Sequence, residues 1–179
     1  MKKSKTLLFG LIFTLTACGG GGGSGDGINF KGRKVNKEEY ISLVNAAETS
    51  NPYNYATVNY TQWNYGAGKS TGTMNYYRSG TNWTKQGASS TTDFAYLLTY
   101  QTLKGSLSQI ENLSSSDTCT LYAEPFGISI EMDNSGTLQT IELVFEEHGL
   151  AKEYYQSSGT SQMGVVYYQY CTVTYSVVN

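Results

Sequence analysis

The sequence predicts an α+β fold, an antiparallel curved sheet or half-barrel of about eight strands with an N-terminal helix and a mid-chain helical segment packed on one face. Hydrophobic residues alternate with a period of two through most of the chain after residue 55, which indicates half-buried strands. Only two segments, near residues 36–50 and 92–105, show the helical period instead. Short polar connections between the strands favour antiparallel pairing.

The first predicted helix opens the domain. Asn36, with Glu39 three residues later, is typical of a capping box. Apolar side chains then recur at helical spacing, at Tyr40, Leu43, Val44 and Ala47. Asn51-Pro52 ends the pattern. Because a helix this short is not stable alone, its apolar stripe must pack on the sheet.

Strands are predicted on both sides of a second helix, which begins near Asp93 and ends at Gly105, with one or two further turns as an option over residues 107–113. Three precede it, at residues 55–65, 71–78 and 81–86. Trp63 falls on the opposite parity to Ala56 and Val58, so we expect a bulge near residues 61–62. Five strands follow the helix, at residues 119–124, 126–132, 138–147, 151–156 and 163–176.

The first eighteen residues are typical of an exported protein's leader. Lys2, Lys3 and Lys5 precede an apolar run, residues 6–15, that is too short for a bilayer core of about 30 Å. The run ends in Leu15-Thr16-Ala17-Cys18, which resembles the lipobox of bacterial lipoproteins position by position. The resemblance implies cleavage before Cys18 and acylation of its thiol, with palmitate among the chains. Such a lipid would hold the protein on the extracytoplasmic face of the inner or outer cell membrane.

The chain therefore divides into three parts: a signal peptide (1–17), a lipidated Cys with a Gly-rich tether (18–34), and a single β-rich domain (35–179). The run from Gly19 to Gly27 has almost no side chains to bury and is typical of a flexible coil. Removal of the leader leaves nine basic against fourteen acidic residues. This acidic balance argues against nucleic-acid binding.

The order of these elements resembles the lipoprotein-carrier LolA/LppX-like class. The shared order begins with an acylated cysteine, a tether and a first helix. Antiparallel strands follow, interrupted by a helical segment. No diagnostic sequence motif accompanies this order. The resemblance implies a half-open barrel whose concave face is plugged by helices and can hold lipid. A cystatin-like or other curved sheet over a helix is the alternative.

No catalytic or metal constellation is recognisable, and we expect neither enzymatic activity nor a cofactor. The only histidine, His148, lies in a predicted tight turn, where we expect its side chain to be exposed. Zinc needs several Cys or His at ligand spacing, which this chain lacks. Glu142 and Glu146 on one strand would lie about 13 Å apart at about 3.3 Å per residue, too far for the paired carboxyls of a glycosidase.

Two cysteines, Cys119 and Cys171, remain once Cys18 is lipidated. An even number in an exported domain favours a disulfide, so the sequence predicts this bond. Two buried free thiols are the alternative.

Aromatic residues are abundant, with sixteen tyrosines and two tryptophans. Most should be structural, because Tyr fills a core while its hydroxyl stays hydrated. Six in the first half of the domain form a candidate ligand cavity: Trp63, Tyr65, Tyr76, Trp83, Tyr96 and Tyr100. They would line either a cavity for an apolar ligand or an exposed platform for sugars.

The sequence favours a membrane-anchored, extracytoplasmic binding protein for a hydrophobic or lipid ligand or for another component of the cell envelope. The alternative is a surface adhesion or carbohydrate-binding module, and an enzyme of unrecognised type is least favoured. A lipid carrier needs a deep apolar pocket, whereas a carbohydrate module needs a flat aromatic face.

Overall fold

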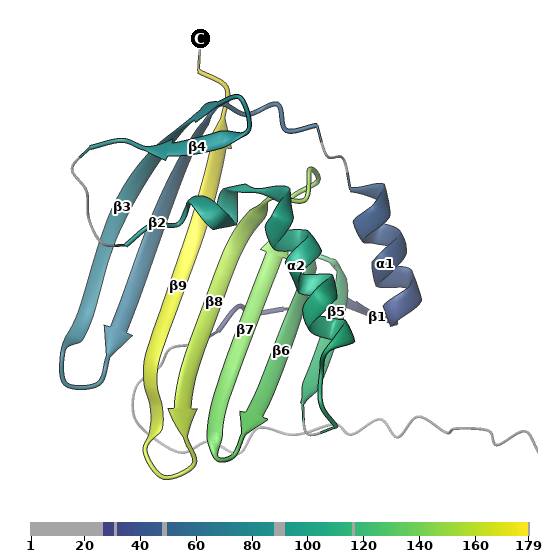
Figure 1. Cartoon of the computed structure of the whole chain (residues 1–179), viewed down its shortest axis with the longest axis vertical. Helices are drawn as coiled ribbons and strands as arrows, with labels where there is room; N and C mark the ends of the chain where they lie inside the picture. Colours follow the sequence, from purple (N-terminus) through teal and green to yellow (C-terminus); the bar gives the residue numbers. More distant parts are fainter. Residues whose placement is uncertain (1–26, 31, 48–49, 88–91, 116, 179) are drawn as a thin grey trace, which may run out of the picture.

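The computed structural model describes residues 27–30, 32–47, 50–87, 92–115 and 117–178. They form one twisted sheet with both helices against the same face (Figure 1). The sheet has nine strands within this part of the chain, in the order β1-β5-β6-β7-β8-β9-β2-β3-β4, and every neighbouring pair is antiparallel. The predicted antiparallel α+β class is thus confirmed, whereas the sheet is open and has nine strands in the described residues instead of about eight.

The strands follow the chain in two groups. They are β1 (Arg33–Val35), β2 (Tyr55–Asn64), β3 (Gly68–Ser79), β4 (Asn82–Lys85), β5 (Thr118–Glu124), β6 (Phe126–Asn134), β7 (Thr137–Phe145), β8 (Ala151–Thr160) and β9 (Gly164–Ser176). Strands β5 to β9 form one meander and β2 to β4 another, and the pairing of β9 with β2 joins them. The helical elements are α1 (Lys37–Ala46), the 3₁₀ turn η1 (Ala95–Leu98) and α2 (Tyr100–Glu111).

Both helical segments begin at polar residues that satisfy free backbone N–H groups. The Glu39 N–H donates to Asn36 Oδ1 at 2.8 Å, as the capping box predicts. Before η1, the Ala95 N–H donates to Asp93 Oδ1, and the Tyr76 hydroxyl both donates to Asp93 and accepts from the Phe94 N–H. These hydrogen bonds hold the residues at the start of η1 against Tyr76 of β3.

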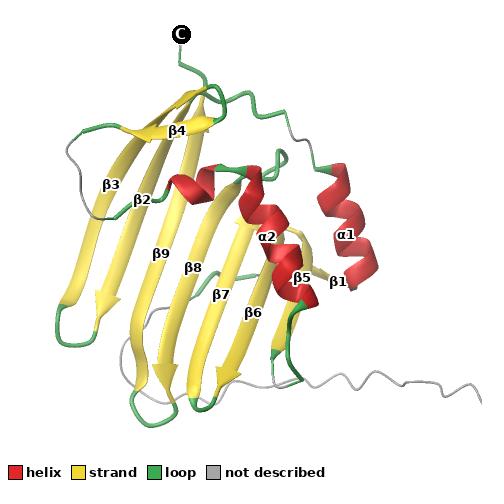
Figure 2. Cartoon of the chain, viewed as in Figure 1, coloured by secondary structure: helices red, strands yellow, loops and turns green. Residues whose placement is uncertain are grey.

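The core lies between the helices and the face of the sheet that they cover, called here the helix face (Figure 2). Buried side chains of α1, η1 and α2 meet buried side chains of the central strands. The fully buried set includes Tyr40, Val44, Phe94, Leu97, Leu98, Leu103, Val58, Tyr76, Ile128 and Ile130. The opposite side of the sheet is called the back face.

Three local features differ from the sequence-based prediction. Strand β2 pairs without interruption on both sides from Tyr55 to Asn64, so the bulge near residues 61–62 is absent. Gly105 does not end the second helix, which continues to Glu111, because Leu103 and Ser106 are buried and hold this segment on the sheet. The ninth strand is β1, which pairs with β5 at the sheet edge.

Residues 27–30, which the sequence analysis assigns to the tether, cross the back face of the sheet before β1. We call residues 27–30 the strap. Its Ile28 N–H donates to the Glu142 carboxylate on β7, and the Phe30 ring stacks on Tyr122 of β5. A Cβ at Gly127 would lie 2.8 Å from Phe30 Cε1, so a glycine on β6 permits this close crossing. In Figure 1 the strap passes behind the strands, on the side opposite α2. The predicted signal peptide, 1–17, and residues 18–26 of the predicted tether lie outside the described residues.

Candidate functional site

The six aromatic residues of the predicted cavity do not share one cavity. Tyr76 and Trp83 are buried in the core under η1, and Tyr100 lies at the start of α2. Tyr96 is 48% exposed on η1. Trp63 lies on the back face, and Tyr65, 68% exposed, follows β2 at the hairpin to β3.

No deep apolar pocket separates the helices from the sheet in the part of the chain that the structure describes. The space is filled by the buried side chains of the core. Four cavities of the described structure have volumes of about 190 to 320 Å³ and open at the surface, and two of them are lined by strand and hairpin residues alone. Because binding pockets for small organic ligands typically measure about 300–1,000 Å³, these volumes are at or below the lower limit.

A row of aromatic side chains instead follows the back face of β3, β2 and β9. The cross-strand register places all of its members on this face: Tyr77, Tyr55, Trp63, Tyr168 and Tyr170. We call these five residues the aromatic row. Tyr55 packs edge-on against Tyr77 at 5.0 Å, and Trp63 stacks on Tyr168 at 6.0 Å with ring planes 14° apart. The two pairs lie at opposite ends of β2, about 26 Å apart at about 3.3 Å per residue.

Short polar side chains separate the two ends of the aromatic row. Thr57 donates to Asn75 Oδ1 at 3.0 Å, and Thr73 donates to Asn59 Oδ1 at 2.8 Å. Each amide thus uses its oxygen for the neighbouring strand, and its NH₂ group has no side-chain partner within the described chain. The surface between the rings therefore carries amide NH₂ groups that can donate hydrogen bonds.

Tyr170 is held in place on this surface by an acid of the neighbouring strand. Its hydroxyl donates to Glu153 Oε2 at 2.9 Å. Burial, with a further contribution from the Glu153 carboxylate, raises the pKa of Tyr170 to about 12. The phenol is thus neutral at physiological pH, and its ring orientation is fixed by the hydrogen bond.

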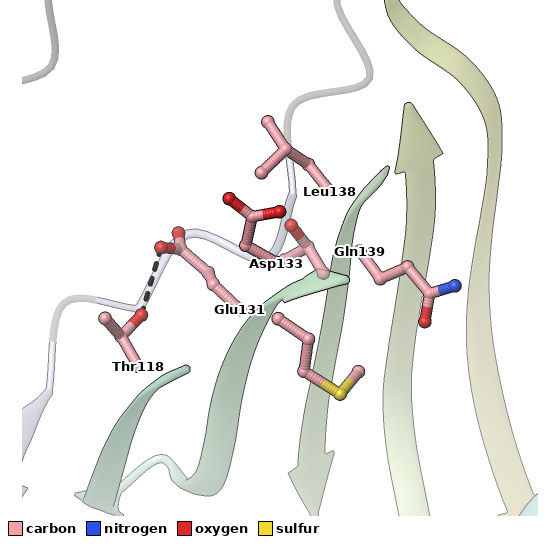
Figure 3. Close-up of a pocket in the computed structure, with 7 residues that line it drawn as sticks. Thr118, Glu131, Asp133, Leu138 and Gln139 are labelled. Atoms are coloured by element: carbon pink, nitrogen blue, oxygen red, sulfur yellow. Dashed lines mark hydrogen bonds between the residues drawn. The ribbon is translucent and has the colours of Figure 1, made fainter. Parts of the chain in front are cut away.

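A second surface feature lies at the far end of β5, β6 and β7 (Figure 3). Thr118 donates to Glu131 Oε2 at 3.1 Å beside a cavity of about 280 Å³. Asp133 and the exposed Leu138 also line it. Within the described chain, no three His, Cys, Asp or Glu side chains lie close enough together to hold a metal ion.

His148 is buried rather than exposed, which corrects the sequence-based expectation. Its side chain is about 10% exposed, and its Nδ1 lies 2.8 Å from Glu146 Oε2. The other Glu146 oxygen accepts from the N–H groups of His148 and Leu150, and the Tyr53 ring packs edge-on against the imidazole. The hydrogen bonds of Glu146 to His148 and Leu150 therefore stabilise the turn between β7 and β8.

The predicted disulfide is also wrong in this structure, where Cys119 and Cys171 are free thiols. Cys119 lies on β5 and Cys171 on β9, so strands β6, β7 and β8 separate them. At about 4.8 Å per strand this is about 19 Å across the sheet, whereas bonded cysteines need Cα atoms within about 7 Å. The alternative of two free thiols holds instead.

Four members of the aromatic row were missed by the sequence-based search: Tyr55, Tyr77, Tyr168 and Tyr170. A usable signal was present, because Tyr55 and Trp63 share one parity in a strand whose other parity is apolar over its first half. This pattern indicates an uninterrupted strand with aromatic residues on both faces, whereas the sequence analysis interprets it as a bulge.

The comparisons with known proteins give no family assignment. No protein-family model, no curated protein and no solved structure matches this chain. In the described residues, neither helix has the length and apolar character needed to cross a bilayer.

Proposed function

We propose that this protein is a lipid-anchored, extracytoplasmic binding protein, without enzymatic activity, that recognises a glycan of the cell envelope. The aromatic row carries the proposal. A sugar ring presents a face of C–H groups that packs on the electron-rich face of an aromatic ring. Trp63 stacked on Tyr168, and Tyr55 beside Tyr77, offer two such platforms along one strand.

The polar surface between the two platforms supports the same ligand class. The amides of Asn59 and Asn75 have NH₂ groups free to donate to sugar hydroxyls, and threonine hydroxyls flank them. A ligand that covers the row is extended, since the platforms are about 26 Å apart. A polysaccharide chain fits this length.

Binding of a hydrophobic or lipid ligand, which the sequence favours over a carbohydrate module, has less support. The core fills the space under the helices in the described chain, so a buried acyl chain would need the helices to move. The proposed anchor rests on the sequence Leu15-Thr16-Ala17-Cys18. Two or more acyl chains on Cys18 give stable membrane binding.

Binding to purified envelope polysaccharides tests the proposal. A Cys18→Ser form of the mature chain, which carries no lipid, is sedimented with insoluble peptidoglycan and run on native gels that contain soluble surface polysaccharide. We expect binding to at least one of them. We also expect Trp63→Ala combined with Tyr168→Ala to weaken it at least ten-fold, equal to about 1.4 kcal/mol.

The matched control is Tyr65→Ala, which removes an exposed tyrosine outside the aromatic row and should leave affinity unchanged. Equal affinity of the double variant and the parent protein would contradict the assignment of the row. Binding to phospholipid vesicles, without binding to any glycan, would replace the glycan by a membrane surface. A lipid found by native mass spectrometry of the purified protein would restore the carrier hypothesis.

A further inference from the structure

A cavity of about 320 Å³ opens where the β3–β4 hairpin meets the start of α2. Figure 1 shows β4 and the segment leading into α2 at the same end of the sheet. The cavity lies on the helix face, away from the aromatic row. Its walls include Arg78, Trp83, Tyr100, Gln101, Asn51 and Leu150.

Arg78 is the only charged residue in the wall of this cavity. Its guanidinium carbon lies 6.0 Å from the centre of the Trp83 ring, and the side chain is half-buried. No ion pair or side-chain hydrogen bond to Arg78 occurs within the described ranges. The guanidinium therefore keeps its N–H donors available beside a cavity.

The two aromatic walls are fixed in position before any ligand binds. Trp83 is only 9% exposed and belongs to the core. The Tyr100 hydroxyl donates to the Val44 carbonyl of α1 at 3.1 Å. Rings that are already ordered lose little conformational entropy on binding, which favours affinity.

The first turn of α2 forms another part of the cavity wall. Its N-cap residue, Thr99, makes no side-chain capping bond, and the first turn contains no acidic residue. The amide groups of Asn51 and Gln101 also line the cavity. The partial positive charge of the helix start thus adds to that of Arg78, while the amides can bond to hydroxyl groups.

We propose that this cavity binds a small sugar acid, with its carboxylate on Arg78 and its ring against Trp83. A guanidinium binds a carboxylate through two parallel N–H···O bonds. The exposed part of Trp83 and the Tyr100 ring line the same cavity as Arg78 and offer apolar contact to a sugar ring. The volume suits one ring. This inference goes beyond the proposed function, since the two surfaces are on opposite faces and neither needs the other.

Tryptophan fluorescence tests the inference directly, because the chain contains only Trp63 and Trp83. A Trp63→Phe form of the mature, unlipidated chain leaves Trp83 as the single reporter. We expect D-glucuronate to change its emission in a saturable way and D-glucose, which lacks the carboxylate, to produce no saturable change. Raising the salt concentration should weaken the response to glucuronate.

Variants of Arg78 complete the test. Arg78→Gln should weaken glucuronate binding at least ten-fold, and Arg78→Lys, which keeps the charge but not the planar fork, should weaken it less. Lys152→Gln removes an exposed positive charge on β8 and should bind as the parent does. Thermal unfolding of each variant identifies any loss of fold, and Arg78→Lys provides the comparison if Arg78→Gln unfolds.

Three results would overturn the inference: no response to glucuronate, an equal response to glucose, or unchanged affinity in both Arg78 variants. Failure of the glycan proposal is a separate result. The Trp63→Ala, Tyr168→Ala protein retains Arg78 and Trp83, so it should still bind glucuronate even where polysaccharide binding is lost.

Discussion

The ring of Phe30 stacks on the ring of Tyr122, with centroids 4.2 Å apart and planes within 9° of parallel. Phe30 precedes β1, whereas Tyr122 lies on β5, more than ninety residues later in the chain. The contact holds the strap on the back face and covers Tyr122, which is otherwise a large apolar ring open to water. Phe30 thus contacts the sheet from a position before β1.

Phe30→Ala should lower the free energy of unfolding by about 1–2 kcal/mol, because it uncovers Tyr122 and loses a stacked ring pair. Urea unfolding monitored by circular dichroism measures this change. Tyr65→Ala, at an exposed ring, should change stability by less than about 0.5 kcal/mol. Equal effects of the two substitutions would mean that the strap contributes nothing to stability.

Glu142 should make stability fall as the pH rises. Desolvation under the strap raises the pKa of its carboxyl above the ordinary value of 4.5, although the Ile28 N–H and the Ser129 hydroxyl oppose this. The folded protein therefore holds this proton more tightly than the unfolded chain. The stabilisation is fully present below about pH 4.5 and is lost as the pH rises through the folded-state pKa.

Glu142→Gln removes this titration. Its free energy of unfolding, measured between pH 4 and pH 8, should fall less with rising pH than that of the wild type. Glu147→Gln, on the exposed side of the β7–β8 turn, should keep the wild-type profile. Parallel profiles for the wild type and Glu142→Gln would show that the buried carboxyl is not responsible.

Tyr40→Phe should leave stability unchanged or increase it by about 1 kcal/mol. The Tyr40 hydroxyl is buried without a hydrogen-bond partner in the described structure, and such a group costs free energy. The ring contact with Phe126 at 5.3 Å is kept. Tyr76→Phe is the matched comparison, since its hydroxyl bonds to Asp93 and to the Phe94 N–H. Tyr76→Phe should lower the free energy of unfolding, measured by heat or urea, by about 1–2 kcal/mol.

The two domain cysteines should react with a thiol reagent only slowly in the folded protein. Burial raises the pKa of Cys119 to about 11 and that of Cys171 to about 12, which lowers the fraction of reactive thiolate at pH 8. In denaturant without reductant, mass spectrometry of the Cys18→Ser chain should show two labels. Absence of both labels until a reductant is added would establish a disulfide instead.

The sequence predicted those elements whose signals are local. The Asn36–Glu39 capping box and the period-two pattern of the later strands reflect contacts within a few residues, and both are present in the structure. Strand β1 was missed because three residues show no period, and its pairing with β5 joins segments about ninety residues apart. Such a pairing leaves no local pattern to detect.

The candidate site was harder to predict, because the two faces of β2 both carry aromatic residues. Tyr60 and Trp63 belong to opposite faces of an uninterrupted strand, and composition alone does not separate core rings from surface rings. The burial of His148 depends on Tyr53, from a distant segment, and Arg78 became notable only through its position over Trp83. These relationships arise from the tertiary fold.

The strap also determines how the domain would respond to mechanical force. A pull from the N-terminal side acts first on the strap, which the Ile28–Glu142 hydrogen bond and the Phe30–Tyr122 ring stack hold on the sheet, and only then on the β1–β5 pairing. Peeling of four residues would release about 14 Å of chain at about 3.4 Å per residue. The protein could therefore lengthen under a brief load, and close again, while its sheet and ligand surfaces stay intact.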